Sequence, residues 1–384
     1  MKAPLDKEAS KPAPHTVFSA AGAPAPERDR SLDGLRGVAS LSVLLLHLSQ
    51  RLGDVHYSSF SSSLYDQGRK GVSLFFILSA LALTMATARR VSAEIHFKRN
   101  FYIRRAFRIL PLYWIFVLYW GTVHAPAPVS SLAANFGFFF DGLSLDKFHA
   151  VSPGIWSLQI EETFYLVFPL LFMRMIDPIQ AVCGLCISTI VMFIILRIGL
   201  WTGFRSDLSQ FLTPFSSHYV FWIGVSLFHL RGSIWFRSLL ERIESVGKAW
   251  VLDLVAGTAL FVTWSQVDWF SNFALSFVVV SSFSSRTLIG RLVRGRLLGL
   301  FGKYCYSIYL LHFLILEYLS PTIARCFSWL PAATEGRMLI LAPPVMAITL
   351  LVGHVSFRLI EQPTINLGAR LIGILDRRES GKDA

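Results

Sequence analysis

Charged residues are scarce in this chain of 384 residues. Asp, Glu, Lys and Arg together make up 16% of the chain and hydrophobic residues 53%, whereas about 25% charged residues is usual for a soluble domain. The mean hydropathy is +0.53. Apolar runs close to the ~20 residues that cross a bilayer recur along most of the chain. These features argue against an ordinary soluble protein and predict an all-α, polytopic membrane helix bundle.

Cysteine is also scarce, and the common nucleotide and metal motifs are missing. Four cysteines are too few for a disulfide framework. Cys183 and Cys186 lie within an apolar run, where we expect them to pack in the core rather than bind zinc. The sequence has no P-loop, no G-x-G-x-x-G, no HExxH and no nucleophile elbow. An ATP-driven transporter or a zinc protease therefore has no support, and no permanently bound cofactor or metal is expected.

Positive charge is distributed unevenly along the chain. We predict about ten spans, at 33–51, 71–89, 109–123, 155–175, 179–200, 216–232, 249–265, 269–285, 303–320 and 338–360. Of the 36 Lys and Arg residues, 27 fall in segments on the side of the N-terminus and 7 on the other side. This bias predicts that both termini are cytosolic. It also accounts for the net charge of +12 without a nucleic-acid partner.

The chain divides into one long membrane domain and two short tails. Residues 1–30 are rich in Ala, Pro and charge, and we predict a disordered cytosolic tail rather than a signal peptide. Residues 31–363 form the predicted membrane domain, and 364–384 a short cytosolic tail. Within 124–154, an apolar stretch too short to span is expected to be re-entrant or to lie at the surface.

The segment 31–48, SLDGLRGVASLSVLLLHL, combines an apolar span with two ionisable side chains. Arg36 and His47 are 11 residues apart, so they lie on nearly one helix face and about 16 Å apart along the axis. With Asp33 at the cytosolic end, His47 falls in the outer half of the bilayer. Ionisable groups at such depth usually face a protein interior or a wet cavity and mark a site. The alternative is a snorkelling arginine and a histidine bonded to a neighbouring helix, and this segment alone does not decide.

The fourth predicted span begins with IWSLQIEETFY and carries two adjacent acids, Glu161 and Glu162. Counting from the outer surface puts Glu161 about 9 Å deep, close to the expected depth of His47. Ser157, Glu161 and Tyr165 follow at intervals of four and share a helix face. A carboxylate beside an imidazole fixes its tautomer and raises its basicity, as a general base requires. The alternative is a structural ion pair, but two acids and a histidine exceed what packing requires.

The ninth predicted span, in KYCYSIYLLH, supplies three more polar side chains. Tyr306, Tyr309 and His312 lie on or near one face, with His312 near the midplane. We treat them as supporting residues of the same site. A lone histidine here could equally make only an interhelical hydrogen bond.

Arginine clusters in KRNFYIRRAFRILPLYW, at the cytosolic mouth of the third predicted span. Arg104, Arg105 and Arg108 bring two or three guanidinium groups together, and such forks suit phosphate. The alternative is the topology bias plus attraction to anionic headgroups. That alternative explains the charge but not the choice of arginine or the tight spacing.

Other polar residues stand near the ends of two spans. Arg69 and Lys70 are predicted at the outer surface, against the topology bias, where they could meet an anionic acceptor or lipid. Ser79 is expected in the inner half of the second span. Glu361 is expected to pair with the arginine cluster, with Pro363 ending the last helix.

Taken in order, these motifs resemble the acyltransferase-3 family of integral membrane acyltransferases. The resemblance covers roughly 30–363. LDGLRG with His47 resembles the family's Arg-x10-His span, and GVSLFFILSA, RRAFRILPLYW, WSLQIEETFYLVFPLL, YSIYLLH and EQP resemble its later motifs. One departure is Ala80, which stands where the family usually has glycine.

The resemblance implies an acyl-CoA donor, usually acetyl-CoA, and a sugar hydroxyl as acceptor. It implies that Arg104, Arg105 and Arg108 bind the coenzyme and that Arg36 lines its path. His47, oriented by Glu161, would then deprotonate the acceptor or carry the acyl group transiently.

The acceptor-side residues are expected to be Arg69, Lys70 and Ser157. O-antigen, exopolysaccharide, a lipid-linked oligosaccharide and a secreted glycoside all fit, and the expected location is the inner membrane. A transporter or flippase of a lipid-linked glycan is the competing class; it would favour an internal inverted repeat, which the sequence does not show. A non-catalytic scaffold leaves the buried acid and histidine unexplained.

Overall fold

The computed structural model describes residues 29–51, 66–138, 154–172, 177–202, 215–264, 268–326, 335–379 and 381. Within these ranges every regular element is a helix, which confirms the predicted all-α class. The predicted tail at 1–30 lies almost wholly outside the described residues, as does 139–153 of the segment predicted to be re-entrant.

The helices follow in chain order, with 3-10 or π-helical turns marked η. They are α1 Arg30–Arg51, η1 Gln67–Arg69, α3 Lys70–Arg90, α4 Phe97–Tyr119, η2 Trp120–His124, α5 Val129–Phe136, α6 Trp156–Phe172, α7 Pro178–Thr202, α9 His218–Gly232, α10 Ile234–Ser245, α11 Trp250–Val262, α12 Asp268–Phe283, α13 Leu288–Val293, α14 Arg296–Lys303, α15 Cys305–Cys326, α16 Glu335–Ser356, η3 Phe357–Glu361 and α17 Gln362–Glu379.

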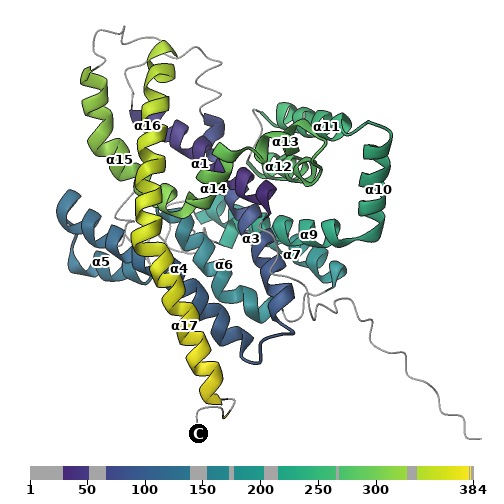
Figure 1. The fold of residues 1–384 in the computed structure, drawn as a ribbon, viewed down its shortest axis with the longest axis horizontal. Coiled ribbons are helices and arrows are strands. Elements are labelled where there is room, and N and C mark those ends of the chain that lie inside the picture. The colour runs from purple at the N-terminus through teal and green to yellow at the C-terminus, as the bar shows by residue number, and fades with distance from the viewer. Residues whose placement is uncertain are drawn as a thin grey trace, which may run out of the picture.

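Helix α1 packs most extensively against α14, α3 and α15 (Figure 1). The contact with α14 depends on glycine at both sides. A Cβ on Gly37 would overlap the carbonyl oxygen of Leu298, and a Cβ on Gly302 would overlap that of Asp33. In lipid, where burial from water drives little helix association, such close backbone contact supplies the packing energy.

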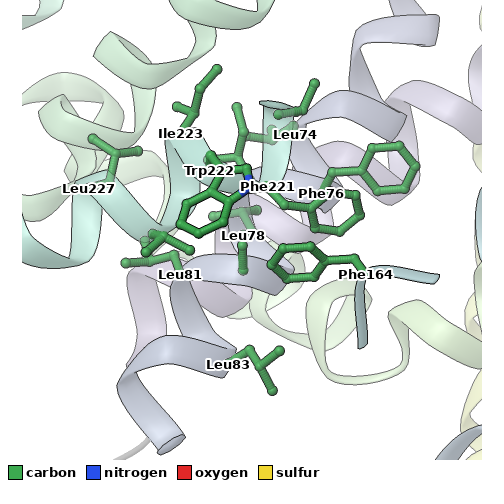
Figure 2. Close-up of a cluster of buried hydrophobic side chains, with 14 of the residues drawn as sticks. Leu74, Phe76, Leu78, Leu81, Leu83, Phe164, Phe221, Trp222, Ile223 and Leu227 are labelled. Carbon is green, nitrogen blue, oxygen red and sulfur yellow. The ribbon is translucent and has the colours of Figure 1, made fainter. Parts of the chain in front are cut away.

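The largest core cluster joins α3, α6 and α9 (Figure 2). Phe221 on α9 stacks on two rings, on Phe164 at 4.3 Å between centroids and on Phe76 at 4.6 Å. The cluster thereby fixes α6 beside α3, and both helices carry predicted site residues.

Five helical segments are long and apolar enough to cross a membrane, or up to seven if each bent pair of helices counts as one span. That is fewer than the ten predicted, because α6, α9 and α12 are each shorter than 18 residues within the described ranges. The span predicted at 249–265 corresponds to α11, which is bent by 110° relative to α10.

The C-terminal end of the bundle differs from the prediction. Pro363 does not end the last helix, because α16, the π-helical turn η3 and α17 form one candidate span over Met338–Glu379 (Figure 1). A proline has no N–H to place in the helix, and local π-type adjustment can accommodate it. The tail predicted at 364–384 is thus helical up to Glu379, and it packs on α4 through Arg99, which contacts Asp376 and Glu379 at 2.5 Å each.

Two smaller predictions were wrong. Cys183 and Cys186 are exposed on α7 rather than packed in the core. The third span was predicted to begin at 109, but helix α4 begins at Phe97 and continues through Pro111, so the arginine cluster lies within the helix.

Gly224 on α9 provides a test of the core contact with α3. We expect Gly224→Ala to lower stability by about 1–3 kcal/mol, the usual cost of overpacking. Its new Cβ would overlap the Ile77 carbonyl oxygen and approach the Ala80 Cβ at 2.9 Å. Thermal unfolding in detergent measures the loss. Gly257→Ala on α11 is the matched control, since no atom lies within 4 Å of its Cβ; equal melting of the two variants would refute the packing argument.

Candidate active site

Three cavities adjoin one another through the bundle. We call them the basic cavity, of about 750 Å³, the central cavity, of about 320 Å³, and the outer cavity, of about 560 Å³. Arg36, Arg108 and Tyr306 line both the basic and the central cavity. Phe76 and Tyr309 line both the central and the outer cavity. The shared lining residues place the three cavities in series across the bundle, and we call this series the route.

The two ends of this route match the two sides expected from the charge distribution. Residues lining the basic cavity come from chain segments or span ends predicted to be cytosolic. Those lining the outer cavity include the opposite ends of two of these helices, namely the last turns of α1 and the first turns of α3. The charge count and the geometry are independent, and they agree.

The basic cavity carries far more positive than negative charge. Its seven basic side chains are Arg30, Arg36, Arg89, Arg108, Arg231, Arg294 and Lys303, and its three acids are Asp29, Asp33 and Glu361. Such an excess suits an anion with several charges.

Two of its acids already have basic partners. Arg231 donates to Asp29 at 2.7 Å, and Arg36 lies 3.7 Å from Asp33. Burial raises the pKa of the Asp29 carboxyl, but hydrogen bonding by Ser31 and the Arg231 guanidinium outweigh it, so the pKa lies below its usual value. The third acid, Glu361, is buried in the π-helical turn η3 and accepts a hydrogen bond from Ser307.

The predicted arginine cluster is divided among three environments. Arg104 is not among the residues that line the three cavities. Its guanidinium donates two hydrogen bonds to the Glu94 carboxylate, each 2.9 Å long. Arg105 lines the central cavity and lies over the Tyr165 ring at 4.7 Å. Arg108 is exposed at the junction of the basic and central cavities.

Glu161 lies in the central cavity rather than beside His47. Its carboxylate accepts hydrogen bonds from Ser79, at 2.6 Å, and from Tyr165. The interval of four that predicted a shared face for Ser157, Glu161 and Tyr165 is confirmed, since all three line this cavity. Glu162 turns away from it, and its buried Oε1 has no hydrogen-bond partner among the described residues.

Two tyrosines stand at the boundaries between cavities. Tyr306, between the basic and central cavities, donates to the Ile109 carbonyl at 2.7 Å. Tyr309, between the central and outer cavities, donates to the Gly154 carbonyl at 3.0 Å and contacts the Ser157 hydroxyl. Both hydroxyls are therefore held in fixed positions across the route.

His47 lines the outer cavity, and its ring is hydrogen-bonded to a second histidine. The His47 Nδ1 and His312 Nε2 atoms are 3.1 Å apart, and the other nitrogen of His312 lies 2.5 Å from the carbonyl oxygen of Tyr309. His312 is 1% exposed. Phe313 packs against the His47 ring at 4.6 Å between centroids.

This chain of contacts assigns the protons. The Tyr309 carbonyl can only accept, so His312 Nδ1 carries a proton and donates it. A neutral imidazole then has an unprotonated Nε2, and burial disfavours the charged form. His312 Nε2 must therefore accept from His47 Nδ1, which leaves His47 Nε2 with its lone pair. Such a nitrogen can take a proton from a hydroxyl or attack an acyl carbon.

The sequence had placed Arg69, Lys70 and Ser157 on the acceptor side. Arg69 and Lys70 line the outer cavity, whereas Ser157 lines the central cavity. The sequence analysis did not single out the other charged and polar residues that line the cavities. Arg89, Arg231, Arg294 and Lys303 had been counted only as topology charges. Asn272 in the outer cavity carried a detectable signal, namely an amide within an apolar span.

Comparison with known proteins shows to which family the chain belongs. The family described as an acyltransferase domain matches residues 29–358. The O-acetyltransferase OatA of Staphylococcus aureus (strain MRSA252) is 23% identical over 91% of this chain and 59% of its own length. The peptidoglycan O-acetyltransferase OatA of Listeria monocytogenes is 30% identical over 36% of this chain and 23% of its own.

The Bacillus subtilis protein YrhL, whose name gives it provisionally as a peptidoglycan O-acetyltransferase, is 32% identical over 36% of this chain and 23% of its own length. The chain thus spans less than two thirds of each of these relatives. No solved structure shows a significant match.

Proposed function

Since this chain belongs to the acyltransferase-3 family, we propose that it is a membrane O-acyltransferase. It would move an acyl group, in our proposal an acetyl group, from cytosolic acyl-CoA to a hydroxyl of an envelope or secreted glycan. The observation that carries the proposal is a histidine with an assigned free nitrogen, His47, at the end of a route whose other end holds seven basic side chains.

The basic cavity is the proposed site for the phosphates of the donor. Guanidinium groups suit phosphate oxygens because their N–H donors match them in pairs. Arg36 and Arg108 stand where the basic cavity meets the central one, so a donor bound there would extend its pantetheine arm into the central cavity. The thioester would then approach the outer cavity past Tyr309.

At the outer cavity, His47 Nε2 takes the proton of the acceptor hydroxyl while its oxygen attacks the thioester carbon. The C–O bond forms, the C–S bond breaks, and the proton passes from His47 to the departing thiolate. In the alternative order, Nε2 attacks the thioester carbon first and the thiolate leaves. The hydroxyl oxygen then displaces the acyl group from the ring, and the hydroxyl proton passes by way of Nε2 to the thiolate. In either order His312, rather than Glu161, orients His47.

Glu161 receives a different proposed role. Ser79 and Tyr165 both donate to it, and Arg105 lies over Tyr165, so the carboxylate holds together one wall of the central cavity. It would shape the passage of the donor arm rather than act on the imidazole.

Replacing His47 tests the chemistry directly. We expect His47→Ala to reduce acyl transfer from labelled acetyl-CoA by more than about 100-fold, the lower range for loss of a general base. Binding of acetyl-CoA to purified protein in nanodiscs should be retained, because the basic cavity is intact. Transfer at the wild-type rate would reject His47 as the reacting group.

His312 is proposed as a positioning residue, and an amide distinguishes that role from simple packing. His312→Ala should lower transfer by about 10-fold or more, because His47 Nδ1 loses its acceptor. His312→Gln, whose carbonyl can accept the same proton, should restore part of the rate. If His312→Gln and His312→Ala are equally slow while both melt like the wild type, the proposed proton arrangement is wrong.

Two arginines one turn apart on α4 test the donor site. Arg108→Gln should weaken acyl-CoA binding by about 10-fold at low salt, with a smaller loss at high salt where charges are screened. Arg104→Gln removes the same charge from the Glu94 contact, outside the cavities, and should change affinity little. Equal losses of affinity in equilibrium binding would show that the basic cavity is not the phosphate site.

A further inference from the structure

The outer cavity contains a basic pair whose position is fixed by backbone contact. Arg69 and Lys70, at the end of η1 and the start of α3, both line the cavity together with His47. A Cβ on Gly68 would overlap the Ser42 carbonyl oxygen of α1. Only glycine permits this approach, which holds the two cations beside the helix that carries His47.

The charge of this cavity is not explained by topology. The outer segments are depleted of Lys and Arg, yet this pair stands at the outer end of the route. Among the described residues that line the outer cavity there is no Asp or Glu. Arg69 lies 3.9 Å from Asp66 outside the cavity, with both side chains more than half exposed, so this contact competes weakly for a ligand. Lys70 donates one of its three N–H groups to the Thr263 carbonyl.

A second, independent feature of the cavity is an unsatisfied amide. Asn272 is 4% exposed, and its Nδ2 donates to the Tyr219 hydroxyl at 2.7 Å. Its buried Oδ1 has no hydrogen-bond partner among the described residues, and a buried acceptor of this kind usually has one. A hydroxyl or amide N–H of a bound molecule would satisfy it.

The remaining lining of the outer cavity suits a sugar ring. Trp156, Trp269 and Tyr219 offer flat apolar faces, and Ser73 and Gln50 add hydroxyl and amide groups. A volume of about 560 Å³ falls within the roughly 300–1,000 Å³ of small-molecule sites. Aromatic faces with a few placed polar groups are the usual composition of such a site.

We propose that the outer cavity binds an anionic saccharide, with a carboxylate or phosphate of the sugar on Arg69 and Lys70 and a sugar hydroxyl or amide on Asn272. This inference rests on the proposed function, because it names the class of acceptor that presents its hydroxyl to His47. A neutral glycan would bring no negative charge to the positive charges of Arg69 and Lys70. An anionic lipid headgroup would use the same charges but would not need the enclosed amide.

The test compares two tetrasaccharides of similar size on the full chain in phosphatidylcholine nanodiscs. Hyaluronan tetrasaccharide carries carboxylates and chitotetraose is neutral. We expect the hyaluronan tetrasaccharide to bind about tenfold tighter at low salt. The preference should shrink in high salt and disappear in the double variant R69Q/K70Q. Asn272→Leu should weaken the binding of both tetrasaccharides, since it removes the amide contact that they share.

The control K248Q/R370Q removes two exposed cations that do not line the outer cavity. It should keep the full preference for the hyaluronan tetrasaccharide. Equal binding of the two sugars, binding of neither, or a preference that survives R69Q/K70Q would each overturn the proposal. So would tight binding of dioctanoyl phosphatidylglycerol alone, which would assign the pair to lipid. Acyl-CoA binding and its dependence on Arg108 are measured separately, so failure here is distinguishable from failure of the proposed function.

Discussion

Ionisable side chains are costly in hydrocarbon, and the arrangement of this bundle follows from that cost. Arg36, Arg105 and Glu161 belong to three different helices, yet all face one interior space. Helices α4 and α6 therefore have a lipid-facing side and a side turned to the route, whereas α1 is enclosed along its length except at its two ends. The cavities exist because the polar groups must be enclosed somewhere. The acyl chemistry proposed here uses a polar interior that packing alone would have filled.

Close backbone contact lets α1 serve as the common wall. Glycines at Gly37 and Gly302 bring α1 and α14 together, and Gly68 brings η1 onto α1 near its outer end. Side chains at these points would widen the bundle and separate the cations from the helix that carries His47. Small residues thus set the distances between charged groups, although they carry no charge themselves.

Much of the site could be predicted from the sequence, because helical spacing fixes which residues share a face. The interval of 11 between Arg36 and His47 correctly put both on the route, at different levels. The predicted pairing of Glu161 with His47 was wrong, because counting along two helices gives the heights of the two residues but not the direction in which each side chain points. His312 was found as a polar residue, while its bond to His47 depends on how α15 packs on α1. The prediction that Pro363 ends the last helix was wrong for a local reason, because the π-helical turn before it has no sequence signal of its own.

A membrane that stores an ion gradient cannot contain an open aqueous pore, and the two boundary tyrosines bear on this requirement. Tyr306 is tied to the Ile109 carbonyl and Tyr309 to the Gly154 carbonyl, so each aromatic ring is held at the boundary between two cavities. A slender acyl-bearing arm would have to displace one ring at a time, whereas hydrated ions would meet two aromatic rings in series. The same hydroxyls that position the rings would thereby keep the resting protein electrically tight while it handles substrates from both sides.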